Sequence, residues 1–185
     1  MIGVNMTSGS DARAISIAVV EAALHLHESE VSGAVDEVLL SMPSVHSVLS
    51  RAVAETSAQR HRLVRLAIHL AREVLAIWQA TYPDQHGPVE AVRAAEAWAS
   101  CPCERHAAEA AVRQQQAVQQ ALAAWRPPAT NVAWSGRTAA WVADAPRHGW
   151  QAVAAIVGAC RATSTEKVIA AAEIFFARET SRGLD

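Results

Sequence analysis

Three residues that lie close together in the sequence have side chains that bind soft metal ions. They are Cys101 and Cys103, on either side of Pro102, and His106 three residues further on. A structural zinc site needs four such ligands, usually two pairs that the fold brings together, and here there is one cluster. Because Pro102 is expected to splay the two thiols, we expect this segment to end one helix and begin the next, without a metal.

Other arrangements that carry catalysis are missing from the sequence. The eight histidines form no HExxH or related ligand spacing, and the glutamates give no set of inward carboxylates of the di-iron type. There is no glycine-rich phosphate loop, nucleophile elbow or kinase signature. We therefore expect a protein that is not an enzyme and that uses no cofactor.

A run of basic residues is a candidate binding surface. The polar face of a helix predicted over 57–81 carries a basic set: Arg60, Arg62, Arg65, His69 and Arg72. Such a face could contact phosphate, an anionic partner or an acidic protein patch. The common alternative is a helix face that only meets solvent.

The chain has six tryptophans, and several occupy apolar helix positions, where packing in the core is the ordinary role. Trp134 and Trp141 follow the Pro127-Pro128 linker and have polar neighbours. Because tryptophan is also prominent at binding hot spots, this pair is the better candidate for an exposed contact surface.

The elements that must position these residues are all helical. Alanine is abundant, glycine is scarce and no period-two strand pattern occurs, which favours helix. We predict an all-α fold, a compact bundle of seven to nine helices built from antiparallel hairpins. The best-defined helices are predicted over 11–27, 57–81, 88–99, 104–125, 134–145, 147–161 and 165–180, with two shorter ones near 31–39 and 45–53.

The apolar spacing also predicts which helix faces point inward. The stripe of helix 57–81 is Leu63, Leu66, Leu70, Val74, Ile77 and Trp78. For helix 104–125 the expected core side is Ala108, Ala111, Val118, Leu122 and Trp125, and for helix 165–180 it is Val168, Ile169, Ala172 and Phe176.

The chain of 185 residues is long enough for one domain with a small addition. We expect a flexible tail at 1–9, an N-terminal helical piece at 10–56 and a main helical domain at 57–185. One continuous domain over 10–185 is the alternative.

Composition narrows the environment and the partners. The net charge of −2 disfavours nucleic acid as a partner, because domains that bind it are usually basic. Three cysteines do not make a disulfide framework. No uninterrupted apolar run approaches ~18 residues and the N-terminus lacks a secretory pattern, so we expect no membrane span and a cytoplasmic protein.

The segment from Tyr82 to Trp98 predicts how two helices meet. Pro83 ends the first helix, since proline disfavours helix at the residue before it, and Pro88 suits the first position of the next. Ala91 and Ala95 leave room for a neighbouring helix, and Trp98 fills the end. We expect the two helices to pack antiparallel.

The run from Leu63 to Ser100 resembles the opening helices of an all-helical family, immunity family five of bacterial polymorphic toxin systems. The resemblance lies in a Leu/Ala/Val-rich helix that enters a turn at Pro83-Asp84, a second proline at Pro88, and a following helix of the A-V-x-A-A-x-A-W type. Similar features continue to about residue 180, including the segment 138–146. One departure is Gly87, where the family commonly has an arginine.

The resemblance implies a non-catalytic immunity protein that binds a cognate protein toxin and occludes its active site. The implied contacts are the exposed turn and the basic face: Asp84, Gln85, His86, Arg62, Arg65 and Arg72. Two alternatives stay open: a helical scaffold or small-ligand-sensing regulator with a Trp-lined pocket, and an enzyme or metal protein built on the Cys-x-Cys cluster. A homodimer through the alanine-rich faces is also open.

The predicted packing of Trp98 can be measured. Trp98→Ala should lower the free energy of unfolding by about 3–5 kcal/mol, because truncating a buried tryptophan loses its transfer energy and leaves a cavity. Denaturant unfolding gives this difference. A loss below about 1 kcal/mol would mean that Trp98 is exposed and that the predicted packing is wrong.

Overall fold

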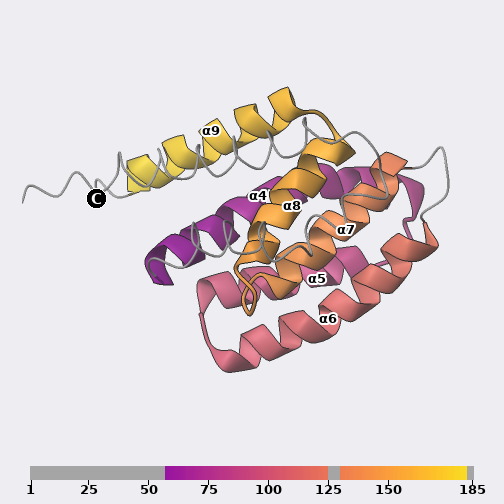
Figure 1. Ribbon diagram of the computed structural model, residues 1–185, viewed down its shortest axis with the longest axis horizontal. Helices are drawn as coiled ribbons and strands as arrows, with labels where there is room; N and C mark the ends of the chain where they lie inside the picture. Colours follow the sequence, from indigo (N-terminus) through magenta and orange to yellow (C-terminus); the bar gives the residue numbers. More distant parts are fainter. Residues whose placement is uncertain (1–56, 125–129, 183–185) are drawn as a thin grey trace, which may run out of the picture.

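The computed structural model describes residues 57–124 and 130–182, which form six α-helices and no strand. These are α4 (Ser57–Thr81), α5 (Gly87–Ser100), α6 (Glu104–Ala123), α7 (Thr130–Asp144), α8 (Trp150–Ala162) and α9 (Thr165–Arg182). They pack as one bundle (Figure 1), so the all-α prediction is confirmed for this part of the chain. None of these helices is long and apolar enough to cross a bilayer.

Several predictions concern residues outside this part of the chain. They are the tail at 1–9, the helices of the 10–56 piece, the Pro127-Pro128 linker and the core position of Trp125. The total of seven to nine helices and the boundary before residue 57 depend on the same residues, so both stay predictions.

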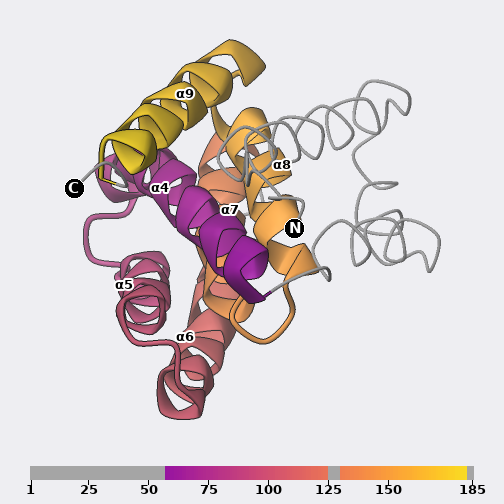
Figure 2. The same ribbon diagram turned by 90° about the vertical axis from the view of Figure 1, so that its left-hand side faces the viewer.

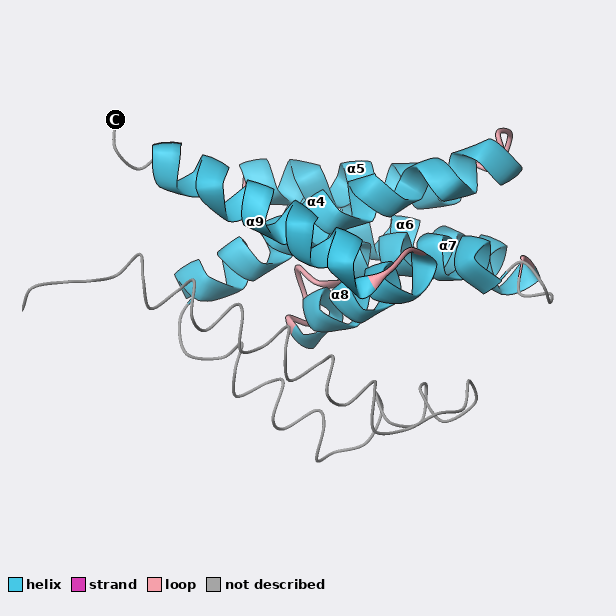
Figure 3. Cartoon of the chain, turned by 90° about the horizontal axis from the view of Figure 1, so that it is seen from above, coloured by secondary structure: helices cyan, strands magenta, loops and turns pink. Residues whose placement is uncertain are grey.

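Helix α4 lies in the middle of the bundle. It packs against α5, α7, α8 and α9, while the hairpin of α5 and α6 lies on one side and α8 and α9 lie on the other (Figure 2). Seen from above, the described elements are helices joined by short loops (Figure 3). The neighbours of α4 therefore approach it from several directions.

This position explains why α4 is more apolar than a surface helix. The predicted stripe is buried apart from the half-buried Ile77, but Val64, Ala67, Ile68, Ala71 and Leu75 are buried as well. A helix that packs on one side needs an apolar stripe of about 100°. The wider burial of α4 leaves only a narrow polar edge.

Trp78 connects α4 to the turn that follows and to α7. Its side chain is 0% exposed, and its indole Nε1 donates a hydrogen bond of 2.9 Å to the carbonyl oxygen of Gln85. A Cβ added to Gly136 would lie only 2.8 Å from the six-membered ring of Trp78. Next to it, the Ser135 hydroxyl donates a 2.7 Å bond to the carbonyl of Val74. Small residues on α7 therefore allow it to approach α4 closely.

Helix α5 behaves as its sequence predicts. Pro83 is exposed in the turn, Pro88 is buried at the start of the helix, and Ala91 and Ala95 are fully buried. Trp98 is 8% exposed and the ring of His61 meets it edge-on, 5.5 Å between centroids. The predicted burial of Trp98 is confirmed.

The predicted inner faces of α6 and α9 need correction. On α6 the buried residues are Ala107, Ala110, Ala117 and Ala121, whereas Leu122 is 51% exposed. The prediction placed the larger residues Val118 and Leu122 of α6 inside. In the structure, alanines of α5, α6 and α7 pack closely against one another, so the alanine side of α6 faces inward. On α9 the predicted core residues Val168 and Ala172 are buried, whereas Ile169 is exposed. Phe175 is buried as well, and the side chain of the predicted Phe176 lies outside the described part of the structure.

The close approach of α7 to α4 predicts the effect of one added methyl group. Gly136→Ala should lower the free energy of unfolding by about 1–3 kcal/mol, because the new Cβ meets the rigid Trp78 indole and overpacks the core. Thermal and denaturant unfolding measure the loss.

Gly87→Ala is the matched comparison, since the atoms in its way belong to the flexible side chain of Gln120. Its loss should be smaller than that of Gly136→Ala. Equal losses, or a more stable Gly136→Ala variant, would contradict the tight packing of α4 against α7.

Candidate functional site

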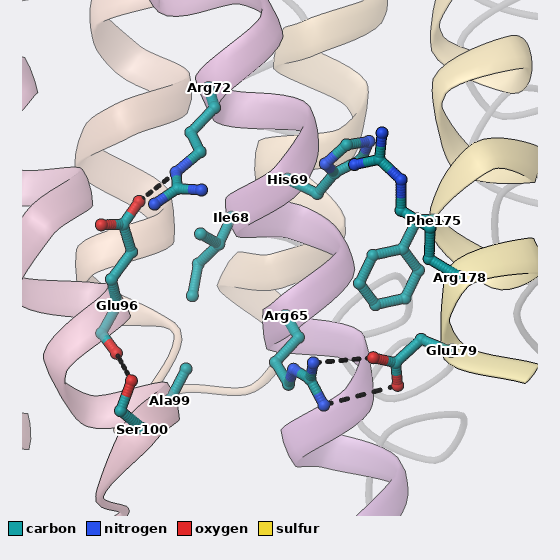
Figure 4. A pocket seen from close by; sticks show the side chains of 10 residues that line it. All are labelled: Arg65, Ile68, His69, Arg72, Glu96, Ala99, Ser100, Phe175, Arg178 and Glu179. Atoms are coloured by element: carbon teal, nitrogen blue, oxygen red, sulfur yellow. Dashed lines mark hydrogen bonds and ion pairs between the residues drawn. The ribbon is translucent and has the colours of Figure 1, made fainter. Parts of the chain in front are cut away.

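A charged groove of about 420 Å³ lies between α4, α5 and α9 (Figure 4). Helix α4 contributes its remaining polar edge, α5 contributes its last turn and α9 forms the opposite wall. The residues that line it are Arg65, Ile68, His69, Arg72, Glu96, Ala99, Ser100, Phe175, Arg178 and Glu179. We refer to these ten residues as the charged groove.

Two ion pairs connect the walls of the charged groove. Both Nη atoms of Arg65 reach the carboxylate of Glu179 on α9, at 2.7 and 3.4 Å. On the other side, Nε of Arg72 donates to Glu96 on α5, and this hydrogen bond raises the pKa of Arg72 above its ordinary value. Each glutamate thus holds an arginine of α4 in a fixed direction.

Two further groups in the charged groove have no such partner. Arg178 is exposed and makes no hydrogen bond or ion pair within the described part of the chain. The Nε2 atom of His69 is buried and lacks a hydrogen-bond partner among the same residues. Figure 4 shows the His69 ring beside Arg178, above the ring of Phe175.

The charge balance of the groove favours an anion. Three arginines against two glutamates leave one net positive charge, with His69 counted as neutral. A buried nitrogen without a partner costs free energy that a hydrogen bond to a ligand would recover. A carboxylate can accept from Arg178, and also from His69 when the ring proton is on Nε2 and the ring turns to expose this atom. The ion-paired arginines add a favourable potential.

The structure does not bring the two predicted contact regions together. Arg65 and Arg72 line the charged groove, but Asp84 and His86 are exposed in the turn at the far end of α4. Helix α4 ends at Thr81, so at about 1.5 Å per residue the start of that turn lies about 14 Å beyond Arg72. Gln85 is half-buried there, and its carbonyl accepts the Trp78 bond. Arg62 is half-buried and does not line the groove.

The predicted exposure of Trp134 is wrong. Its side chain is 8% exposed and lies against the half-buried Trp141, with 5.9 Å between ring centroids. The guanidinium groups of Arg137 and Arg161 cover these rings, with Arg161 4.8 Å from the centroid of Trp134. One polar sequence neighbour that suggested a surface position, Arg137, lies over both rings, and Arg161 from α8 also covers Trp134.

The cysteine cluster also differs from expectation. Pro102 does not splay the thiols: the ligand atoms of Cys101, Cys103 and His106 all lie within 4.8 Å of one another. The backbone amide of His106 lowers the pKa of Cys103 below its ordinary value, and the hydrogen bond with Cys103 raises the pKa of Cys101. Splaying by Pro102 is therefore no argument against a metal at this position, although the cluster still offers three ligands, not the four of a structural zinc site.

Comparison of the chain with models of known protein families, with curated proteins and with solved structures gives no match. The resemblance to immunity family five thus stays a prediction from the residues of the 63–100 run.

The ion pairs of the charged groove should contribute little to stability. Glu96→Gln is expected to change the free energy of unfolding by less than about 1 kcal/mol, because the Arg72–Glu96 pair is partly exposed and such pairs are weak. Chemical denaturation compares it with Glu73→Gln, an exposed position on α4. If Glu96→Gln lowered the free energy of unfolding by more than about 2 kcal/mol, the ion pair would be important for stability, and the groove would not be free to bind a partner.

Proposed function

We propose that this protein is a non-catalytic binding protein that holds an acidic segment of a partner protein in the charged groove. The observation that supports this most is Arg178, a cation with no ion-pair partner among residues 57–124 and 130–182, beside the Nε2 of His69, which lacks a hydrogen-bond partner there too. A carboxylate that enters between them gains a charge-assisted hydrogen bond from Arg178.

The ion-paired arginines would make this binding selective. Both Nη atoms of Arg65 are engaged by Glu179 before the partner arrives, so less of its side-chain freedom is lost on binding. The two glutamates repel additional negative charge near each end of the groove. Such a pattern prefers one or two acidic side chains at defined positions over a polyanion.

The partner we propose is a cognate protein toxin, as the resemblance to immunity family five implies. A standard interface covers about 800 Å² on each protein, which is wide enough to reach from the groove to the exposed Asp84 and His86. The groove would then be the anchor and the turn a second contact. The toxin would lose activity because its active site is covered, in the cytoplasm of the cell that makes both proteins.

Two features favour binding over the other readings. Both carboxylates of the groove are engaged by arginines, which suits positioning of charge more than proton transfer to a substrate. For the regulator with a Trp-lined pocket, the expected lining is missing: no tryptophan lines the charged groove, and Trp134 is buried against Trp141.

The proposal predicts that the gene directly upstream encodes a toxin-domain protein, and that protein is the binding partner to test. The purified toxin should bind the full chain with a Kd below about 1 µM by calorimetry. Arg178→Glu should weaken binding by about 10- to 100-fold, because the cation at the anchor becomes an anion.

Arg93→Glu is the matched control. It reverses an exposed arginine on α5 that pairs with Glu90 and lies outside the groove. This variant should bind the toxin as the natural chain does. Equal losses for Arg178→Glu and Arg93→Glu would overturn the groove as the anchor, and a neighbouring gene without a toxin domain would overturn the choice of partner.

A further inference from the structure

We infer that Cys101, Cys103 and His106 form a zinc-binding site at the corner between α5 and α6, with one coordination position open to solvent. This site is separate from the charged groove and does not depend on the proposed partner. Thiolate and imidazole are the ligands that zinc prefers in proteins, and three protein ligands with an open fourth position are a known arrangement for it.

The backbone brings these three side chains to one side for simple reasons. Cys101 follows α5, and its amide closes that helix by bonding the carbonyls of Ala97 and Trp98. Both Cys101 (φ −143°, ψ 89°) and Cys103 (φ −133°, ψ 159°) have extended backbones. In an extended segment, side chains two residues apart point to the same face.

His106 joins the pair because of where α6 begins. Cys103 is the N-cap residue of α6, so His106 is the third residue of the helix. Side chains at these two positions lie next to each other, as they do in a capping box. The ends of α5 and α6 thus fix the backbone of all three ligands, so little backbone conformational entropy would be lost when a metal binds.

The distances fit a zinc ion. A tetrahedral site with Zn–S of about 2.3 Å and Zn–N of about 2.0–2.1 Å needs about 3.6 Å between sulfur and nitrogen and about 3.8 Å between two sulfurs. The Sγ of Cys103 lies 3.4 Å from Nδ1 of His106, and all three ligand atoms are within 4.8 Å. The Cys103–His106 pair already fits to within a few tenths of an ångström, and the exposed Cys101 thiol has to move by up to about 1 Å to complete the site.

Binding requires a defined change in protons. Two thiol protons leave to solvent, and the sulfur electron pairs then bond the zinc ion. The Nδ1 atom of His106, which lies 3.0 Å from the carbonyl of Cys101, has to offer its electron pair, so the ring proton belongs on Nε2. Arg105 lies 3.3 Å from that Nε2 and would have to turn away, which its exposed position allows.

The expected consequence is a corner that is tied more firmly. Zinc would connect the end of α5 to the start of α6, directly after Ser100 of the charged groove. Because a metal that binds only the folded state stabilises it, zinc should raise the Tm of the full chain.

Metal titration of the full-length protein tests the site. The reduced, metal-free chain is titrated with zinc chloride against a chromophoric chelator, and with cobalt(II) chloride for its absorption spectrum. We expect one equivalent of zinc, a higher Tm, and the thiolate-to-cobalt charge-transfer and tetrahedral d–d bands of a cobalt–thiolate site. Zinc below about a tenth of an equivalent, or cobalt without thiolate bands, would overturn the inference.

Variants locate the ligands. Cys101→Ser, Cys103→Ser and His106→Ala should each weaken zinc binding at least about tenfold. Mutation of residues that only hydrogen-bond to metal ligands already lowers metal affinity about 10- to 100-fold. Cys101 is exposed, so its variant keeps the test valid if another fails to fold.

His148→Ala is the matched control, an exposed histidine paired with Asp144 on α7. It should bind zinc as the natural chain does. Arg105→Ala should bind zinc at least as tightly, because a cation that competes for the ring is removed. Unchanged binding in Cys101→Ser and Cys103→Ser, or equal losses in His148→Ala, would overturn the assignment.

Discussion

The buried indole of Trp78 is the contact on which the arrangement of the helices depends. Its N–H holds the carbonyl of Gln85 and so fixes the turn between α4 and α5. Its six-membered ring packs against the backbone of Gly136, where a side chain would not fit. The missing side chain lets α7 come close to α4. With α5 and α7 placed in this way, α4 is covered on most sides. Its polar residues from Arg65 to Arg72 are confined to one edge, and the charged groove is that edge.

Helix α9 completes the charged groove from the other side. Phe175 packs its ring 5.8 Å from that of His69, and one turn later Glu179 reaches Arg65. An apolar contact and an ion pair at i and i+4 thus orient α9 together, and Arg178 between them is left without a partner in the described part of the chain. The surplus positive charge is a consequence of how this helix docks. We regard that surplus as the basis for binding an acidic partner.

Much of the fold could be predicted, and the failures have clear causes. Helix α4 and the hairpin through Pro83 and Pro88 follow from local rules of periodicity and proline, and they agree with the structure. The inner face of α6 could not be found, because alanine occurs on all its faces and only the neighbours select one. The Arg65–Glu179 pair joins residues 114 positions apart, which no local pattern reveals. The helical spacing of Val168, Ala172 and Phe175 does indicate the inner face of α9. The next position on that face, four residues after Phe175, is Glu179, the partner of Arg65.

We propose that the charged groove is the surface that meets the partner. Hydrogen–deuterium exchange of the chain, alone and with the proposed partner toxin, tests this directly, because backbone amides at a covered surface exchange more slowly. We predict slower exchange at the end of α5 (96–100) and along α9 (175–179), on both walls of the groove. Protection confined to the outer face of α6, with both walls unchanged, would contradict the account.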